Sequence, residues 1–460
     1  MNPNTIPNIT IPVIGLPTIG IPSVGFPSAS GGGLVWPKGL KESIKAIYDP
    51  KKQGLTNYDV IEAYTEDFKK WNNSPEKYTG SLTSNSLALT NVSQKTALIY
   101  SPIKPYDFKV LITGLQEGQH IKFGFDYGET ILEADKDGVY TLEWKEGLKS
   151  YGIYTNFVGE CNITITQLPT SILKDFSGNG NHAYLYGGKG KLNSGMGVYQ
   201  QDFSKLIISR VDKKQDSFSF TVSGSGGSYL AYMQLGNWNN KAFKILVNIN
   251  AKSDYLYLRF RNSTDAVITS VMLKDGENII PAQNIEGATK AVFEYSLKEG
   301  ESITITQIPD YPDQLCYDGG MCAVAYEFPI LTDYTIIADR TWFNIRDISC
   351  FIGKRNRSGD NLGAFEFEFR ANQALSFGRT NSIIFADSGI VYQTKNSYNG
   401  IGIESGLLDD TDVLIIGAAQ QNINNKPQDI YIGCHGKIII ADRSFTEDEI
   451  TWLKDNWKKI

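Results

Sequence analysis

The chain has 460 residues, of which 41% are hydrophobic and 20% are charged, and its formal net charge is -6. This length gives room for two to four domains, each with a sizeable core. The mild acidity, with no stripe of basic residues to neutralise phosphates, argues against nucleic acid as a partner.

The chain opens with five copies of a five-residue unit over residues 6–30, each with proline in second place. Proline fixes φ and has no N–H, so we expect an extended segment spanning about 75 Å at polyproline pitch. We expect another surface to cover its apolar stripe, which makes the segment an anchor; a flexible linker is the alternative. The anchoring and oligomerising positions are Ile6, Ile9, Ile11, Ile14, Leu16, Ile19, Ile21, Val24 and Phe26.

Beyond a glycine hinge at residues 31–33, apolar and polar residues alternate in short runs separated by turn residues, as in residues 108–112, 121–125, 140–144 and 163–166. This pattern predicts an all-β chain of several antiparallel β-sandwiches, jelly-roll or lectin-like in type. Near the C-terminus, Thr446 and Glu449 form a capping-box pattern that predicts a short helix.

A longer repeat divides the chain into domains. Residues 108–112 (FKVLI) recur as 243–247 (FKILV), and residues 163–169 (ITITQLP) recur as 303–309 (ITITQIP). We therefore expect one sandwich module twice, as copy 1 over residues 78–170 and copy 2 over 205–310. Residues 1–33 form the anchor and hinge, and residues 34–73, 171–204 and 311–460 form one sandwich that the two copies interrupt.

Side chains that commonly carry catalysis are sparse. The only three histidines are His120, His182 and His435, so metal-hydrolase or triad chemistry is a poor expectation. Five cysteines without a CxxC pair predict buried thiols, with a disulfide or metal pair between Cys316 and Cys322 as the alternative. No apolar run reaches membrane-spanning length, and the first residues lack a signal peptide's features. We expect synthesis in a cytoplasm, no membrane insertion, no cofactor and no metal.

The turn at residues 175–181 places oxygen side chains where a calcium loop has them. Asp175, Ser177, Asn179 and Asn181 occupy positions 1, 3, 5 and 7, but position 12 is Tyr186, where such a loop needs a bidentate Glu. We therefore expect a hydrogen-bonded turn, since Asp and Asn bond readily to nearby backbone.

Glu366 and Glu368 stand two residues apart on a predicted strand, as do the acids of some sandwich glycosidases. The strand offers three phenylalanines on one face and Glu366, Glu368 and Arg370 on the other. We therefore expect a half-buried strand with a solvated charged face and no catalytic residues.

Seven tryptophans could stack on sugar rings, but most are expected in cores. Trp238 lies between asparagines and is the candidate for a carbohydrate contact.

Three segments resemble one family. Residues 175–183 (DFSGNGNHA) are similar to the D-x-SGNGNH turn of laminin G-like and concanavalin A-like lectin domains, and residues 315–320 (LCYDGG) resemble their L-x-F-D-G strand. Residues 436–450 (GKIIIADRSFTEDEI) resemble the closing strand and short helix. The chain lacks the second Asp that usually follows the middle motif, which argues against an inherited calcium site.

A proline-rich leader followed by lectin-like sandwiches resembles structural proteins of tailed bacteriophages, particularly head fibres of crAss-like phages that infect gut Bacteroides. The resemblance implies a non-enzymatic head fibre or decoration protein on the virion surface. Its N-terminus would bind capsid or other virion proteins, and it would be a homo-oligomer, with a trimer favoured over a dimer. Weak adhesion to host surface glycans is expected. A tail fibre or receptor-binding protein and a sandwich glycoside hydrolase with carbohydrate-binding modules are the alternatives.

Overall fold

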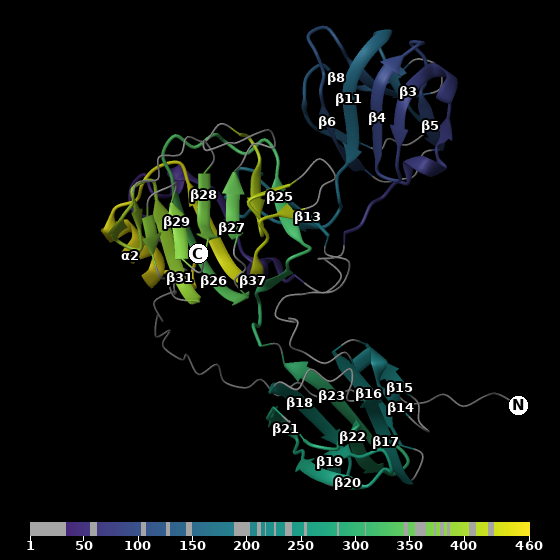
Figure 1. Ribbon diagram of the computed structural model, residues 1–460, viewed down its shortest axis with the longest axis vertical. Coiled ribbons are helices and arrows are strands. Elements are labelled where there is room, and N and C mark those ends of the chain that lie inside the picture. Colours follow the sequence, from purple (N-terminus) through teal and green to yellow (C-terminus); the bar gives the residue numbers. More distant parts are fainter. Residues whose placement is uncertain are drawn as a thin grey trace, which may run out of the picture.

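The computed structural model describes residues 34–55, 62–102, 107–125, 129–143, 150–187, 203–208, 213–216, 218–224, 227–234, 242–252, 255–282, 285–308, 310–344, 348–354, 365–371, 374–377, 381–383, 387–403, 411–421 and 427–460. The expected all-β class is confirmed, because the described residues build several antiparallel sheets arranged as sandwiches. Figure 1 shows a central sandwich with one insert on each side of it.

The central sandwich consists of a seven-stranded and an eight-stranded sheet. The first has the order β1 (Ile44–Tyr48), β37 (Ile432–Ala441), β26 (Thr335–Asn344), β31 (Ser388–Thr394), β32 (Ser397–Tyr398) and β33 (Ile401–Gly402), with β24 (Leu315–Asp318) paired to β37. The second has the order β12 (Ile172–Leu173), β13 (Ala183–Tyr186), β25 (Cys322–Ala325), β34 (Leu414–Ile416), β27 (Ile348–Lys354), β28 (Phe365–Ala371), β29 (Ala374–Phe377) and β30 (Asn381–Ile383). A small ribbon joins β35 (Gln420–Gln421) and β36 (Pro427–Gln428).

The first insert pairs two five-stranded sheets. One has the order β2 (Asn72–Asn73), β5 (Ile99–Pro102), β10 (Ser150–Thr155), β7 (Ile121–Phe125) and β8 (Glu129–Ala134). The other has the order β3 (Tyr78–Leu82), β4 (Ser86–Val92), β11 (Gly159–Gln167), β6 (Phe108–Thr113) and β9 (Gly138–Leu142).

The second insert has the same strand order. Its sheets are β14 (Ile207–Ile208), β17 (Gly227–Gln234), β22 (Lys290–Leu297), β19 (Leu256–Arg261) and β20 (Val267–Met272), and β15 (Lys213–Gln215), β16 (Ser219–Ser223), β23 (Ser302–Ile308), β18 (Phe243–Asn250) and β21 (Gly276–Ile280). The repeated sequences lie on matching strands, the first on β6 and β18 and the second on β11 and β23.

Helices are short. The capping box predicted at the C-terminus is present: the Thr446 side chain accepts from the Glu449 N–H, the Glu449 side chain accepts from the Thr446 N–H, and α2 (Glu447–Asp455) follows. In the described part of the chain, the other helical elements are α1 (Pro50–Gln53) and the 3₁₀ turns Lys41–Ser43, Phe68–Lys70, Pro75–Lys77 and Phe203–Lys205.

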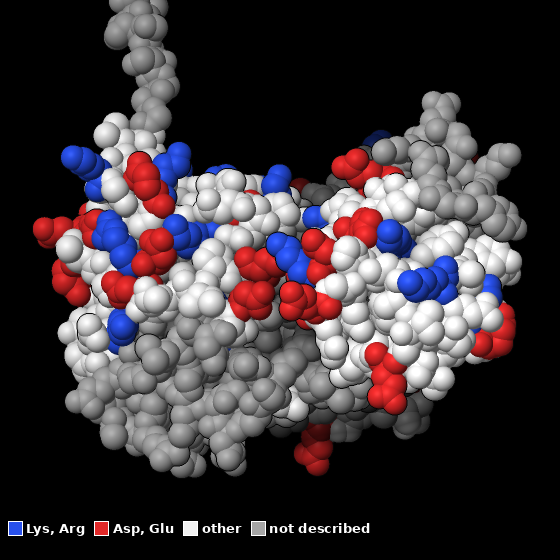
Figure 2. Space-filling view, turned by 90° about the horizontal axis from the view of Figure 1, so that it is seen from above, with Lys and Arg blue, Asp and Glu red and all other residues white. Residues whose placement is uncertain are grey.

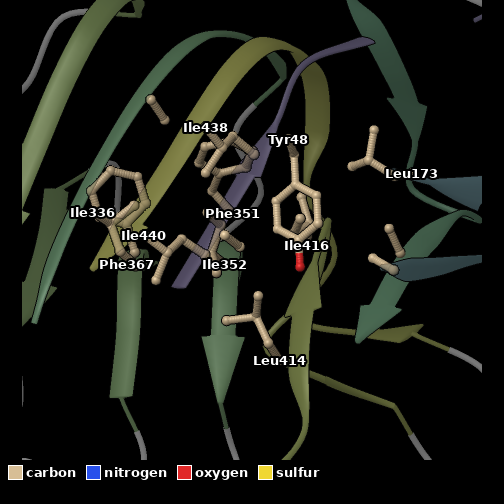
Figure 3. Close-up of a cluster of buried hydrophobic side chains, with 14 of the residues drawn as sticks. Tyr48, Leu173, Ile336, Phe351, Ile352, Phe367, Leu414, Ile416, Ile438 and Ile440 are labelled. Atoms are coloured by element: carbon tan, nitrogen blue, oxygen red, sulfur yellow. The ribbon is translucent and has the colours of Figure 1, made fainter. Parts of the chain in front are cut away.

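The core of the central sandwich lies between its two sheets. Ile336, Ile438 and Ile440 come from the first sheet, and they face Phe351 and Ile416 of the second (Figure 3). Each insert encloses a separate apolar cluster of its own. Burial of these side chains is the main stabilising contribution in each of the three sandwiches.

The inserts begin earlier in the chain than the sequence indicates. Asn72 and Asn73 pair with β5, and Phe68 and Trp71 pack in the core of the first insert rather than in the central sandwich. Phe203 likewise belongs to the core of the second insert. These aromatic side chains precede the repeated strands, so the repeat alone does not show which core they fill.

The first insert is docked on the outer face of the eight-stranded sheet. Leu111 and Val139 of the insert pack against a cluster that includes Tyr184 and Ile415 of the central sandwich. At the edge of this contact the Val139 N–H donates to the Glu327 carboxylate at 3.0 Å. Apolar burial and a hydrogen bond to a charged group therefore both hold this insert in place.

Candidate binding face

Hydrogen bonds between side chains of the turn and nearby backbone groups hold the turn at residues 175–181 in place. The Asp175 carboxylate accepts hydrogen bonds from the N–H groups of Ile47, Ser177 and Asn181, at 2.8 to 3.1 Å, and from the Ser177 hydroxyl at 2.8 Å. The side-chain amides of Asn179 and Asn181 donate to the Lys45 carbonyl. These bonds form the predicted turn and fasten it to β1. The Asp175 carboxylate and the Ser177 hydroxyl act as acceptors within the turn, whereas Asn179 and Asn181 contribute their amide donors.

The expectation that Glu368 lies on a solvated face is wrong. Glu368 is fully buried between the sheets, and its carboxylate accepts from Arg340 Nε at 2.8 Å and Nη2 at 2.7 Å. Trp342 Nε1 and the Tyr398 hydroxyl donate to the same carboxylate at 3.0 and 2.7 Å. Glu368 has a φ of 55°, a left-handed conformation that breaks the regular alternation of a strand and brings its side chain inside together with Phe367.

The other predicted site residues are not placed by the structure. Trp238 and the nine anchoring positions from Ile6 to Phe26 lie outside the described residues, and so does the side chain of Glu366. Among the residues that are described, no three His, Cys, Asp or Glu side chains converge as metal ligands. Within the same part of the chain, no helix is long and apolar enough to cross a bilayer.

A different set of side chains gathers on the outer face of the second insert. Along β19 the apolar Leu256, Leu258 and Phe260 point into the core, so strand alternation places Tyr257, Arg259 and Arg261 on the opposite side. Tyr255 precedes them, and Glu294 of β22 pairs with Tyr257 in the sheet register. We call this group, Tyr255, Tyr257, Arg259, Arg261 and Glu294, the tyrosine–arginine face.

Glu294 is the centre of the tyrosine–arginine face. Its carboxylate accepts two hydrogen bonds from Arg259 Nη1, both at 3.0 Å, one from Arg261 Nη2 at 2.5 Å and one from the Tyr255 hydroxyl at 2.6 Å. The Tyr255 hydroxyl in turn accepts from Arg259 Nη2 at 3.0 Å. The side chains of Arg259, Arg261 and Glu294 remain 21%, 18% and 13% exposed. The polar groups are therefore fixed in position but can still be reached from solvent.

The rings and charges of the face are also coupled. The Arg259 guanidinium lies 5.0 Å from the Tyr257 ring centroid and 5.7 Å from that of Tyr255, within cation–π range. Burial would raise the pKa of Glu294, but hydrogen bonds from Tyr255 and Arg261 and the nearby guanidinium charges hold it below its usual value. The hydrogen bond to Glu294 raises the pKa of Tyr255. The carboxylate is thus charged and the phenol neutral over the physiological pH range.

The matching face of the first insert has different chemistry. On β7 and β10, Tyr154 pairs with Lys122 where Glu294 pairs with Tyr257 in the second insert, and Gly124 takes the place of Arg259. Lys122 forms an ion pair with Glu133, and the Glu133 carboxylate also contacts His120. The two inserts therefore share a strand order but present different side chains on this face.

Sequence reasoning missed the tyrosine–arginine face, although the run LYLRFR at residues 256–261 contains its signal. In this run the apolar Leu256, Leu258 and Phe260 alternate with Tyr257, Arg259 and Arg261, which indicates that aromatic and cationic side chains share one outer face. Chemically, the face offers aromatic rings, N–H donors, a hydroxyl and a carboxylate acceptor on one rigid surface.

No family model matches the chain, and no curated protein matches it. Among solved structures, the chain is similar to a Trypanosoma rangeli sialidase in complex with 2,3-difluorosialic acid, at 11% identity and a TM-score of 0.23, over 90% of this chain and 91% of that one. A second Trypanosoma rangeli sialidase structure has 11% identity and a TM-score of 0.22, over 83% and 84% of the two chains. TM-scores this low support no conclusion about fold or function.

Proposed function

We propose that this protein is a non-catalytic binding protein of a bacteriophage virion, a head fibre or decoration protein that holds host glycans through its second insert. The tyrosine–arginine face is the observation that carries the binding role. The proline-punctuated leader and the lectin-like motifs at residues 175–183 and 436–450 support the place on a virion.

The chemistry of the face suits a saccharide. Sugar hydroxyls both donate and accept, and this face presents guanidinium donors, the Glu294 acceptor and the Tyr255 hydroxyl side by side. Tyrosine rings offer flat apolar area with a polar edge, which matches the amphipathic faces of sugar rings. The network is already assembled without a ligand, so little ordering entropy is lost on binding.

The buried ion pair of Glu368 favours binding over hydrolysis. A retaining or inverting glycosidase needs two carboxyl groups facing one substrate. Glu368 instead points into the core and is occupied by Arg340, Trp342 and Tyr398. Glu368 is therefore not available as one member of the acid pair that the sequence offers for hydrolysis, which supports the proposed binding role.

The surface charge is consistent with a ligand other than nucleic acid. Figure 2 shows Lys and Arg interleaved with Asp and Glu over the described part of one face of the molecule. A broad basic surface would be needed to neutralise a phosphate backbone and displace its counterions. Weak sugar contacts repeated in an oligomer would gain avidity from effective concentration.

A glycan array probed with the full chain, followed by calorimetry on the best ligand, tests this proposal. We expect Tyr257→Ala to weaken binding at least tenfold, about 1.4 kcal/mol. The matched control is Lys244→Ala, which removes an exposed side chain, ion-paired to Glu277, from the other sheet of the same insert and should leave binding unchanged. Equal binding by Tyr257→Ala and wild type contradicts the assignment of the face, and release of new reducing ends from the bound glycan contradicts the non-catalytic role.

A further inference from the structure

Two of the five cysteines meet across neighbouring strands of the central sandwich. In the antiparallel register of β24 with β37, Cys316 lies directly opposite Cys434. Both are fully buried, and together they form a small cluster of their own. Directly opposed residues in antiparallel strands have Cβ atoms about 4.5–5.5 Å apart, and a disulfide needs about 3.5–4.5 Å. A small adjustment of the strands therefore suffices to join the two sulfurs.

The neighbour in sequence is not the neighbour in space. Cys322, the alternative partner for Cys316, lies on β25 in the other sheet and is paired there with Tyr186. The sequence cannot show the Cys316 to Cys434 pairing, because more than one hundred residues separate the two.

The pair lies on the outer side of its sheet. Leu315 and Tyr317, on either side of Cys316, pack into the central core, so strand alternation turns Cys316 away from that core. The Cys434 thiol donates to Gln314 Oε1 at 2.8 Å. Tyr311 and Phe343, half-buried with ring centroids 4.8 Å apart, pack over the cysteines. The sulfurs are thus covered by Tyr311 and Phe343 on the side away from the central core, and we expect a small reagent to reach them when these side chains move.

We propose that Cys316 and Cys434 are a modification site: they form a disulfide when the protein leaves a reducing cytoplasm and meets a small-molecule disulfide. One cysteine thiolate attacks a sulfur of oxidised glutathione and releases one glutathione thiolate. The second cysteine thiolate then attacks the protein sulfur of this mixed disulfide and releases the second glutathione. The two cysteines are oxidised, one glutathione disulfide is reduced to two thiols, and the two cysteine protons end on those thiols.

The disulfide would stabilise the central sandwich against unfolding. It closes a loop that holds most of the strands of both central sheets, from β25 to β36. Closing a loop on the order of 100 residues restricts the unfolded chain strongly, so the oxidised form should unfold at a higher temperature. Burial raises the pKa of the Cys434 thiol, which makes the reaction slow near neutral pH and faster in alkaline buffer.

Glutathione buffers of increasing oxidised fraction, followed by alkylation and peptide mapping of the full chain, test the proposal. We expect loss of two of the five thiols, one crosslinked peptide pair containing Cys316 and Cys434, and a thermal midpoint several degrees higher than that of the reduced protein. Cys350→Ala, a variant of another buried cysteine, should keep the crosslink, and Cys316→Ala should lose it.

The peptide map of the wild-type protein decides the matter even where a variant folds poorly. Cys316 and Cys434 both alkylated in the most oxidising buffer, or Cys316 linked to a different cysteine, overturns the proposal. An unchanged thermal midpoint in fully crosslinked protein contradicts the expectation that the disulfide stabilises the central sandwich. Because the two cysteines lie on the central sandwich and the tyrosine–arginine face lies on the second insert, glycan binding by that face is tested separately.

Discussion

Arg340 and Glu368 form an ion pair that crosses the interior of the central sandwich, from β26 in one sheet to β28 in the other, with both side chains fully buried. Four hydrogen bonds converge on the Glu368 carboxylate, two from Arg340 and one each from Trp342 and Tyr398. Such a pair contributes little net stability compared with apolar residues of similar size. Here it links the two sheets across the core.

Breaking this pair from one side should be costly. Glu368→Gln keeps the shape of the side chain but leaves the Arg340 charge buried without compensation, so we expect a loss of about 3–5 kcal/mol. Urea unfolding followed by tryptophan fluorescence measures it. The control Glu277→Gln removes one partner of an exposed pair with Lys244 and should cost about 0–1 kcal/mol. Equal effects of the two variants would contradict the structural role of the buried pair.

His435 should make the central sandwich sensitive to acid. The imidazole is fully buried, with Nε2 3.0 Å from the Tyr317 hydroxyl and Nδ1 2.7 Å from the Gly436 carbonyl oxygen. Burial lowers the pKa of His435 from 6.5 to about 4. As the pH falls, the imidazole of the unfolded chain takes up a proton before the buried imidazole does. The stability that neutral His435 contributes to the folded state is therefore complete above pH 6.5 and is lost as the pH falls from there through about 4.

Thermal midpoints recorded from pH 7 to pH 4 test this expectation. The midpoint of the central sandwich should fall over this interval, and His435→Gln should flatten the fall while lowering the midpoint at pH 7. A His182→Gln control changes a histidine outside the core, although its pKa is also lowered by burial, so its effect should be smaller. Identical pH profiles for wild type and His435→Gln would refute the assignment.

Docking of the first insert should depend on its apolar contact. Val139→Asp places a carboxylate in this contact and beside Glu327, so charge repulsion and lost burial both favour release of the insert. We expect a larger radius of gyration in solution scattering and faster proteolysis near residues 62–66. Ile279→Asp, at a position on the second insert that is 64% exposed, is the control and should change neither quantity.

Removal of residues 1–33 tests the proposed anchor. We expect the shortened protein to remain folded, because the described cores lie entirely beyond this segment. It should sediment as a monomer and no longer bind phage particles that lack the fibre. A truncated protein that stays oligomeric would count against the anchoring role of the leader.

Local patterns were enough to predict the class of this fold. Alternation in runs such as residues 108–112 and 163–166 predicted strands, since a strand with one buried face needs apolar residues every second place. The repeat at residues 163–169 and 303–309 identified matching strands, β11 and β23, and Thr446 with Glu449 predicted the start of α2. Each of these features depends on residues that are close in sequence.

The tertiary structure alone decided which residues from distant segments meet. Regular alternation predicts that Glu368 faces solvent, but a left-handed φ and the Arg340 charge on the opposite sheet hold it inside. Cys316 faces Cys434 because β24 pairs with β37, and Glu294 orders two arginines because β22 pairs with β19. Strand pairing over long separations depends on the packing of whole sheets, so a local reading of the sequence cannot supply it.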